Sequence, residues 1–245
     1  MTLVAVVFAI VYLGMILGAL PFLQLDRTGI ALLGAIALVA LGALTPEEAA
    51  LSIHLPTLLL LFSFMVLSAQ MRLGGFYTWV TLRIAALPLG PAALLAATML
   101  ATAALSAVFS NDVVCLAVAP VLAEACLRRG IDPVPYLLGL ACAANIGSAA
   151  TLIGNPQNML IGQVLGLPFA AYTLEALVPV LISLAAAWGI IAWRLGKGFH
   201  PETALQERRE GAYATFDPWQ TAKGLAVAGA LVLVFLFTDW PREVA

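Results

Sequence analysis

Phe109-Ser110-Asn111-Asp112 interrupts an apolar region of the chain and decides how that region can fold. Residues 92–108 before it and residues 113–123 after it carry no charged side chain. A carboxylate and a carboxamide in such surroundings cost free energy unless they have polar partners or a function. This stretch therefore predicts a site, and the apolar arms on either side predict two helices that meet at it.

The composition of the whole chain places these arms in a membrane. Hydrophobic residues make up 63% of the 245 residues and charged residues only 10%, with a mean hydropathy of +1.04. A soluble domain is about half apolar and a quarter charged. The apolar residues form continuous runs of about 20, the length of a membrane-spanning helix, rather than the alternating pattern of a β-barrel. The sequence predicts an all-α polytopic membrane protein.

The same composition bears on cofactors and partners. The largest basic clusters are two pairs, Arg128-Arg129 and Arg208-Arg209, so we expect no nucleic-acid partner. The three cysteines show no metal-binding or redox spacing, and neither histidine has a partner that suggests catalysis. We expect no cofactor other than Na⁺ as a coupling ion. We expect the lipid bilayer to surround the protein.

The apolar runs predict about six spans, a helical hairpin and an interrupted helix. Residues 76–86 are too short to span, and Tyr77, Trp79 and Arg83 suit an interfacial helix at the lipid headgroups. We expect residues 1–75 to hold scaffold spans one to three, at 3–22, 28–44 and 55–70. The interfacial helix and the hairpin are expected at 76–130, and the interrupted helix with a following span at 131–195. A cytoplasmic loop is expected at 196–223, and a last span followed by a linker at 224–245.

The hairpin is expected to be re-entrant, with its tip at mid-membrane. Its second arm, residues 113–127, has 15 residues, about 22 Å of helix against about 30 Å of hydrocarbon. Pro120 is expected to shorten the regular part further. Two tilted spans with a tight outer turn are the alternative.

A polar stripe leads to the tip along the first arm. Thr98, Thr102, Ser106 and Ser110 recur every four residues and fall on one helical face. Helix packing and hydrogen bonds to their own backbone can account for the two threonines. Ser110-Asn111-Asp112 needs more partners than lipid supplies, although it could also cap the second arm.

A second polar stretch lies within the apolar residues 134–165, and we expect the helix there to be interrupted from Gly147 to Asn158. It reads Asn145-Ile146-Gly147-Ser148-Ala149-Ala150-Thr151-Leu152-Ile153-Gly154-Asn155-Pro156-Gln157-Asn158. Glycine and proline favour non-helical backbone, which is tolerated at membrane depth only inside protein or beside water. Its freed carbonyls suit Na⁺ and a half-helix N-terminus suits an anion. A plain loop between two short helices is the alternative, and Gly139-x-x-x-Ala143-x-x-x-Gly147 is expected to be a packing face.

Basic residues predict the orientation. With the N-terminus outside and the hairpin returning to its own side, every Lys and Arg except Arg242 lies inside, which is ten of the 11. We therefore expect residues 196–223 in the cytoplasm of a cell whose inner (plasma) membrane holds the protein.

The two polar stretches resemble the ion-transporter superfamily of anion permeases. The matching residues are Phe109-Ser110-Asn111-Asp112-Val113-Val114 with Ala119-Pro120, and the stretch from Asn145 to Pro156. That superfamily includes arsenite permeases, D-type sodium–proton antiporters and citrate or dicarboxylate symporters. The resemblance implies one repeat of an inverted-repeat transporter that works by an elevator-like movement and is a homodimer when full length.

The resemblance also implies which residues form the site. The hairpin tip and the unwound helix would form one cation site and half of the substrate site. Substrate would contact Asn111, Asp112, Thr151, Asn155 and Pro156, and Na⁺ would bind among Ser106, Ser110, Asn111, Gly147, Ser148 and Gly154.

Two features depart from the family pattern. The dicarboxylate branch has Ser-Asn-Thr at the tip, and the carboxylate of Asp112 would repel an anion unless protonated or paired. This favours the arsenite-permease and antiporter branches. The sequence also contains no second Ser-Asn-x tip and no second Gly-Asn-Pro break. We expect an N-terminal half that works with a C-terminal half.

The leading functional hypothesis is a secondary active transporter of an anion or oxyacid, of the arsenite, citrate or dicarboxylate class, coupled to Na⁺ or H⁺. One alternative is a Na⁺/H⁺ antiporter with Asp112 as the titrating ligand, and another is a structural membrane subunit. An intramembrane enzyme is disfavoured, because Asp112 is the only central carboxylate and Ser148 has no evident base.

Overall fold

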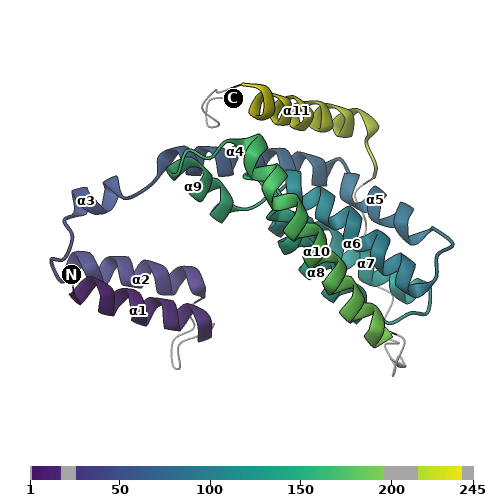
Figure 1. Ribbon diagram of the computed structural model, residues 1–245, viewed down its shortest axis with the longest axis horizontal. Helices are drawn as coiled ribbons and strands as arrows, with labels where there is room; N and C mark the ends of the chain where they lie inside the picture. Colours follow the sequence, from purple (N-terminus) through teal and green to yellow (C-terminus); the bar gives the residue numbers. More distant parts are fainter. Residues whose placement is uncertain (1, 18–25, 196–214, 239–245) are drawn as a thin grey trace. The chain divides into compact units, whose positions relative to one another are not determined.

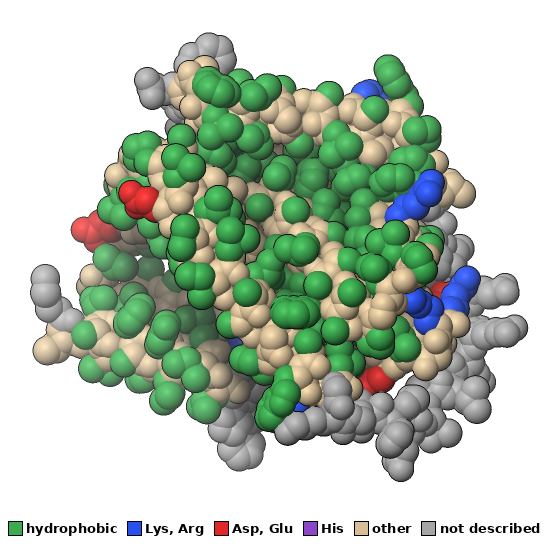
Figure 2. All heavy atoms as spheres, turned by 45° about the vertical axis from the view of Figure 1, so that its right-hand side comes forward, with side chains coloured by type: hydrophobic (Ala, Val, Ile, Leu, Met, Phe, Trp, Pro, Cys, Tyr) green, Lys and Arg blue, Asp and Glu red, His purple; other side chains and the backbone are tan. Residues whose placement is uncertain are grey.

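The protein is helical throughout the residues that the computed structural model describes, 2–17, 26–195 and 215–238 (Figure 1). These ranges contain eleven helices and no strand. Four are long and apolar enough to cross a membrane: α4 (Leu55–Leu73), α6 (Pro91–Val108), α10 (Phe169–Leu195) and α11 (Pro218–Phe237). Hydrophobic side chains cover most of the face seen in Figure 2, as a surface in contact with lipid requires. The prediction of an all-α polytopic membrane protein is confirmed.

The chain divides into two compact units, and the first is residues 1–55. It holds α1 (Thr2–Leu17), α2 (Arg27–Ala40) and α3 (Pro46–Leu51). α1 packs along α2, where a Cβ added to Gly34 would lie 2.3 Å from Val11 Cγ2. α2 ends four residues before the predicted boundary at residue 44, because Gly42 turns the chain with a φ of +68°. Residues 18–22 of the predicted first span lie outside the described residues.

In the second unit, residues 56–245, α6 packs along α8 (Val134–Ser148). Gly139, Ala143 and Gly147 of α8 are all buried. A Cβ added to Gly139 would lie 2.6 Å from Leu95 Cδ1 on α6. The prediction that this small-residue face packs is confirmed.

The hairpin consists of α6 and α7 (Asn111–Arg128), joined by Phe109 and Ser110. The expectation that Pro120 shortens the second arm is wrong, since α7 continues through it. Proline removes one backbone hydrogen bond, but the turns on both sides of it remain. α7 has 18 residues, about 27 Å at 1.5 Å per residue, and is thus still shorter than about 30 Å of hydrocarbon. A re-entrant tip stays a prediction.

The interrupted helix is confirmed, with narrower limits than predicted. α8 ends at Ser148 and α9 (Pro156–Val164) begins after a break of residues 149–155. The Asn155 side chain accepts a hydrogen bond from the Asn158 backbone N–H, 2.8 Å, and Pro156 occupies the first helical position. A proline there starts a helix instead of ending one.

Residues on α5 (Phe76–Ala85) divide between the core and the surface. Tyr77 is 1% exposed, with its ring edge-on to Phe109 at 6.0 Å between centroids. Its assignment to the headgroup region is wrong, because the helical period turns it inward with Phe76 and Thr81. Trp79 and Arg83 are exposed, as an interfacial helix requires.

The last helix begins earlier than predicted. Asp217 caps α11 and Pro218 occupies its first turn, so residues 218–223 are helical instead of part of the predicted loop. Residues 196–214 of that loop and residues 239–245 of the predicted linker lie outside the described residues.

Candidate functional site

The hairpin tip and the helix break meet in space. Asn111 Nδ2 donates a hydrogen bond of 2.9 Å to Asn145 Oδ1, 34 residues away in the chain. The Asn111 backbone N–H donates to the Gly154 carbonyl at 3.4 Å. Thr151 Oγ1 donates to the Ala107 carbonyl at 2.5 Å. Two of these bonds therefore attach the break to the start of α7 and the end of α6, and the third attaches α8, one turn before its end, to Asn111.

Two glycines allow the break to approach α6 closely. A Cβ on Gly147 would lie 2.3 Å from Ala103 Cα, and one on Gly154 would lie 2.3 Å from the Ser148 carbonyl oxygen and 2.8 Å from the Ser106 carbonyl oxygen. Both glycines were predicted as cation ligands. Their contacts give them a packing role, because only a hydrogen fits where each side chain would be. Cation binding by their carbonyl oxygens stays a prediction.

The side chains of the break bond to one another. Ser148 Oγ donates to the Asn145 carbonyl at 2.9 Å and accepts from Asn155 Nδ2 at 3.0 Å. Because Asn155 Oδ1 caps α9, both ends of the Asn155 amide are engaged. Ser148 and Asn155 therefore lie together, as predicted, and fix the shape of the break.

A third helix reaches the same network. Tyr172 on α10 donates from its hydroxyl to the Ala149 carbonyl at 3.1 Å. Asn158 Nδ2 donates to that hydroxyl at 3.0 Å and to the Thr151 carbonyl at 3.0 Å. Two carbonyls that the break frees, those of Ala149 and Thr151, thus already have donors.

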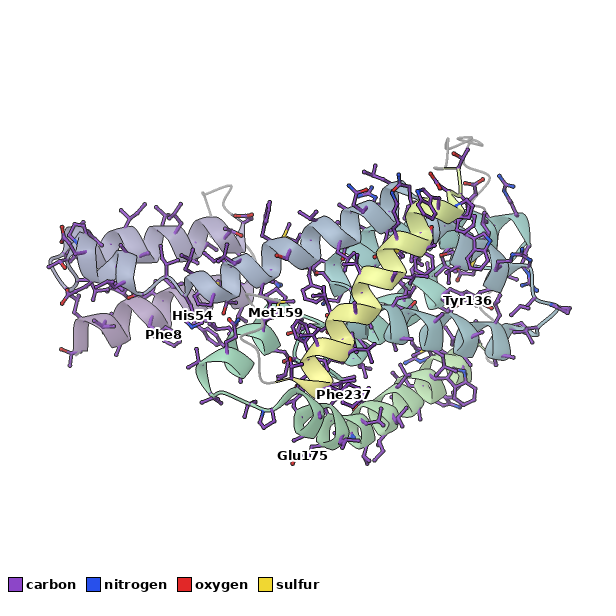
Figure 3. The ribbon with its side chains drawn as sticks, turned by 90° about the horizontal axis from the view of Figure 1, so that it is seen from above. Phe8, His54, Tyr136, Met159, Glu175 and Phe237 are labelled. Atoms are coloured by element: carbon purple, nitrogen blue, oxygen red, sulfur yellow. The ribbon has the colours of Figure 1, made fainter. Side chains whose placement is uncertain are left out.

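The predicted site set missed Asn145, Asn158 and Tyr172. The two asparagines lie in the polar motif and could have been included on that ground. Tyr172 has no motif around it, and only the packing of α10 reveals it. Met159, by contrast, is a core residue, 1% exposed on α9, and Glu175 is exposed on α10 (Figure 3).

Two predicted residues have roles outside the network. Asp112 is exposed in the first turn of α7 and makes no hydrogen bond or ion pair with the described residues. The helix dipole favours its charge there. Pro156 is the first residue of α9 and serves to begin that helix.

The tip contains oxygen atoms that the described residues leave unsatisfied. Ser106 Oγ and Asn111 Oδ1 are buried and have no hydrogen-bond partner in this part of the chain. Ser110 is buried at the N-cap position of α7, but its side chain makes no cap hydrogen bond, so the capping alternative is wrong. A buried unpaired oxygen costs about 1–3 kcal/mol. Hydroxyl and amide oxygens of this kind are ligands for a hard cation.

The chain is similar to proteins of plants, amoebae and bacteria, some of which are named as transporters. A silicon efflux transporter of Oryza sativa subsp. japonica is 33% identical over 180 residues, which are 74% of this chain and 37% of that protein. A Dictyostelium discoideum protein provisionally named transporter arsB is 29% identical over 162 residues, 66% of this chain and 29% of that protein. Magnetosome protein MamN of Paramagnetospirillum magneticum is 34% identical over 170 residues, 67% of this chain and 39% of that protein.

The chain thus matches less than half the length of each of these relatives. A family model described as Citrate transporter matches residues 3–244, almost the whole chain. This protein belongs to the citrate transporter family, within the ion-transporter superfamily.

Proposed function

We propose that this chain supplies one half of the site of a secondary active transporter, in which the hairpin tip and the helix break hold substrate and coupling ion. The observation that carries the proposal is the direct attachment of the hairpin to the interrupted helix, by Asn111 to Asn145 and Gly154 and by Thr151 to the end of α6. Non-helical backbone and unsatisfied polar atoms inside a membrane protein are features of transport sites.

The substrate that we propose is an anion or a small oxyacid. The start of α7 offers backbone N–H groups and a positive dipole end, which attract an anionic or strongly polar group. Asp112 lies in the same turn and opposes a fully charged anion. A weak oxyacid that is neutral near pH 7 satisfies both constraints. Silicon in the rice relative's name agrees with a weak oxyacid, whereas citrate in the family's name is a charged carboxylate of the kind that Asp112 opposes.

We propose Na⁺ or H⁺ as the coupling ion. Asn111 Oδ1 and Ser106 Oγ are the described atoms best suited to a cation, because each is buried without a donor. The rest of the coordination would come from water and from backbone carbonyls of the break that lack donors. The protein would act in the plasma membrane as a homodimer, together with a C-terminal half.

Transport by the complete gene product in cells or proteoliposomes tests the site. Asn111→Ala removes the bond to Asn145 and a cation-facing oxygen, and Asn155→Ala removes the bond to Ser148 and the cap of α9. We expect each variant to lose at least roughly tenfold in uptake or efflux, the effect of about 1.4 kcal/mol.

Thr98→Ala is the matched control. Its hydroxyl bonds only to the Leu94 carbonyl of its own helix, on the same polar stripe but far along α6 from the tip. Expression and membrane insertion are measured for all three variants. Normal transport after both asparagine substitutions would disprove the site assignment.

A further inference from the structure

A set of exposed aromatic and cationic side chains lies where α5 adjoins the start of α11. The Arg83 guanidinium lies over the Trp79 ring, 5.5 Å from its centroid. Trp79 stacks on Phe216 with centroids 5.1 Å apart and planes at 18°. Lys223 Nζ lies 5.5 Å from the Trp219 centroid. We name these five residues the aromatic–cationic strip.

Local structure turns these side chains outward. On α5, Phe76, Tyr77 and Thr81 point into the core, so Trp79 and Arg83 occupy the opposite face. On α11, Trp219 and Lys223 are four residues apart and share an exposed face.

The two faces are held near each other by the backbone. The Asp217 N–H donates to the Gly74 carbonyl at 2.9 Å, which fixes the start of α11 beside the end of α4. Arg72, exposed in the last turn of α4, adds a third cation to this region.

No ion pair neutralises the cations of this region within residues 56–195 and 215–238. Arg72, Arg83 and Lys223 form no ion pair with a carboxylate there. The nearest carboxylate in sequence to Lys223, that of Asp217, accepts hydrogen bonds from the Trp219 and Gln220 backbone N–H groups at 2.9 and 3.1 Å. In the described part of the chain, three cationic side chains of this region therefore remain outside any ion pair, which suits an external anion.

We propose that the aromatic–cationic strip binds the headgroup of an anionic phospholipid. Arg83 and Lys223 would attract its phosphate, and Trp79 and Trp219 would lie at the level of the headgroups, where tryptophan is enriched.

The neighbouring side chains favour a lipid over a soluble anion. Leu82, next to Arg83 in the chain, and Leu225, two residues after Lys223, are each 44% exposed and provide apolar surface for an acyl chain. A phosphate with an attached hydrocarbon tail matches the pairing of cations with exposed leucines. This binding is independent of the proposed transport site, because none of its residues belongs to the tip or the break.

Quenching of tryptophan fluorescence by brominated lipids measures the binding directly. Trp188, Trp193 and Trp240 are replaced by Phe, which leaves Trp79 and Trp219 of the five tryptophans. The protein is reconstituted with brominated phosphatidylglycerol or brominated phosphatidylcholine at equal mole fractions. We expect the anionic lipid to quench with a selectivity on the order of tenfold, which falls as salt rises.

Variants in the same background separate the strip from general electrostatics. Arg83→Gln with Lys223→Gln should bring the selectivity close to one, and Arg83→Lys with Lys223→Arg should retain it. Arg128→Gln is the control, since Arg128 is already paired with Glu124 on α7. Equal quenching by the two lipids, or selectivity that persists without both cations, would overturn the proposal whether or not the protein transports.

Discussion

Gly147 and Gly189 form a matched pair of helical glycines in opposite surroundings. A Cβ at Gly147 would lie 2.3 Å from the Ala103 backbone, whereas a Cβ at Gly189 on α10 would meet nothing within 4 Å. Because backbone cannot move aside as a side chain can, we expect Gly147→Ala to destabilise the fold by about 1–3 kcal/mol or more. Gly189→Ala should be neutral or stabilising by up to about 1 kcal/mol. Thermal unfolding in one detergent compares them, and similar midpoints would contradict the close approach of α8 to α6.

Tyr172 ties α10 to the break through two hydrogen bonds of its hydroxyl. Tyr172→Phe leaves the Ala149 carbonyl without its donor and deprives Asn158 of one acceptor. We expect faster amide hydrogen exchange in residues 149–158 and a loss of about 1–3 kcal/mol of stability. Thr173→Val is the control, because the Thr173 hydroxyl bonds only to the Phe169 carbonyl in its own helix. Unchanged exchange in the break would show that the hydroxyl does not hold it.

Substitution of Asp112 distinguishes H⁺ from Na⁺ as the coupling ion. If its carboxylate takes up and releases the coupling proton, Asp112→Asn abolishes the pH dependence of transport, since an amide does not titrate. If Na⁺ is the coupling ion, Na⁺-driven transport persists in that variant. Flux measured against pH at fixed Na⁺, and against Na⁺ at fixed pH, decides between them. Asn111→Ala should impair transport under both schemes.

Among the helices, the base of the hairpin is held by a single arginine. Arg129, at the end of α7, donates to the carbonyls of Ala85 at 2.8 Å, Leu87 at 3.3 Å and Leu89 at 3.2 Å. These carbonyls lie where α5 ends and the chain turns toward α6. Because one guanidinium satisfies all three, it fixes the connection between the two helices.

We expect Arg129→Ala to increase hydrogen exchange in residues 86–92 and to lower stability by about 1.5–3 kcal/mol. Arg128→Ala removes an exposed pair with Glu124 and should cost no more than about 1 kcal/mol. Mass-spectrometric exchange on both variants makes the comparison. Equal effects would mean that the contacts of Arg129 contribute no more than a surface pair.

The helices show which parts of the fold a sequence can predict. The interrupted helix followed from glycine and proline in an apolar run, and the packing of Gly139 and Gly147 followed from their spacing. The limits of the break were missed because Pro156 was taken as a helix breaker, although Asn155 before it is a cap. Pro120 was misjudged in the same way, since neighbouring turns support a helix across one missing bond.

The sequence could predict site residues only where they lie within its polar motifs. Asn111, Thr151 and Asn155 were identified from their motifs, and the structure brings them to one place. Tyr172 and Arg129 could not be found from the sequence, because their partners are backbone carbonyls far away in the chain. Gly147 and Gly154 have a packing role that their predicted role as cation ligands did not include, since spacing alone does not reveal a close contact.

For the whole chain, the charge distribution predicts a single orientation in the membrane. Thr45, beside the acidic residues at the start of α3, should face the outside, and Phe216, just before α11, should face the inside. With the native cysteines replaced, a membrane-impermeant maleimide added to intact cells should label Thr45→Cys and not Phe216→Cys. Permeabilised cells should label both. The reverse pattern would invert the predicted topology.

The two polar atoms of the Asn111 side-chain amide connect cation binding with the contact between Asn111 and Asn145. Asn111 donates through Nδ2 to Asn145, while Oδ1 is buried without a donor. A cation at Oδ1 would polarise the amide and make Nδ2 a stronger donor. By linkage, the factor by which a bound cation favours the contact between Asn111 and Asn145 equals the factor by which that contact raises the affinity for the cation. Ion occupancy and closure of the tip onto the break would then be a single coupled equilibrium.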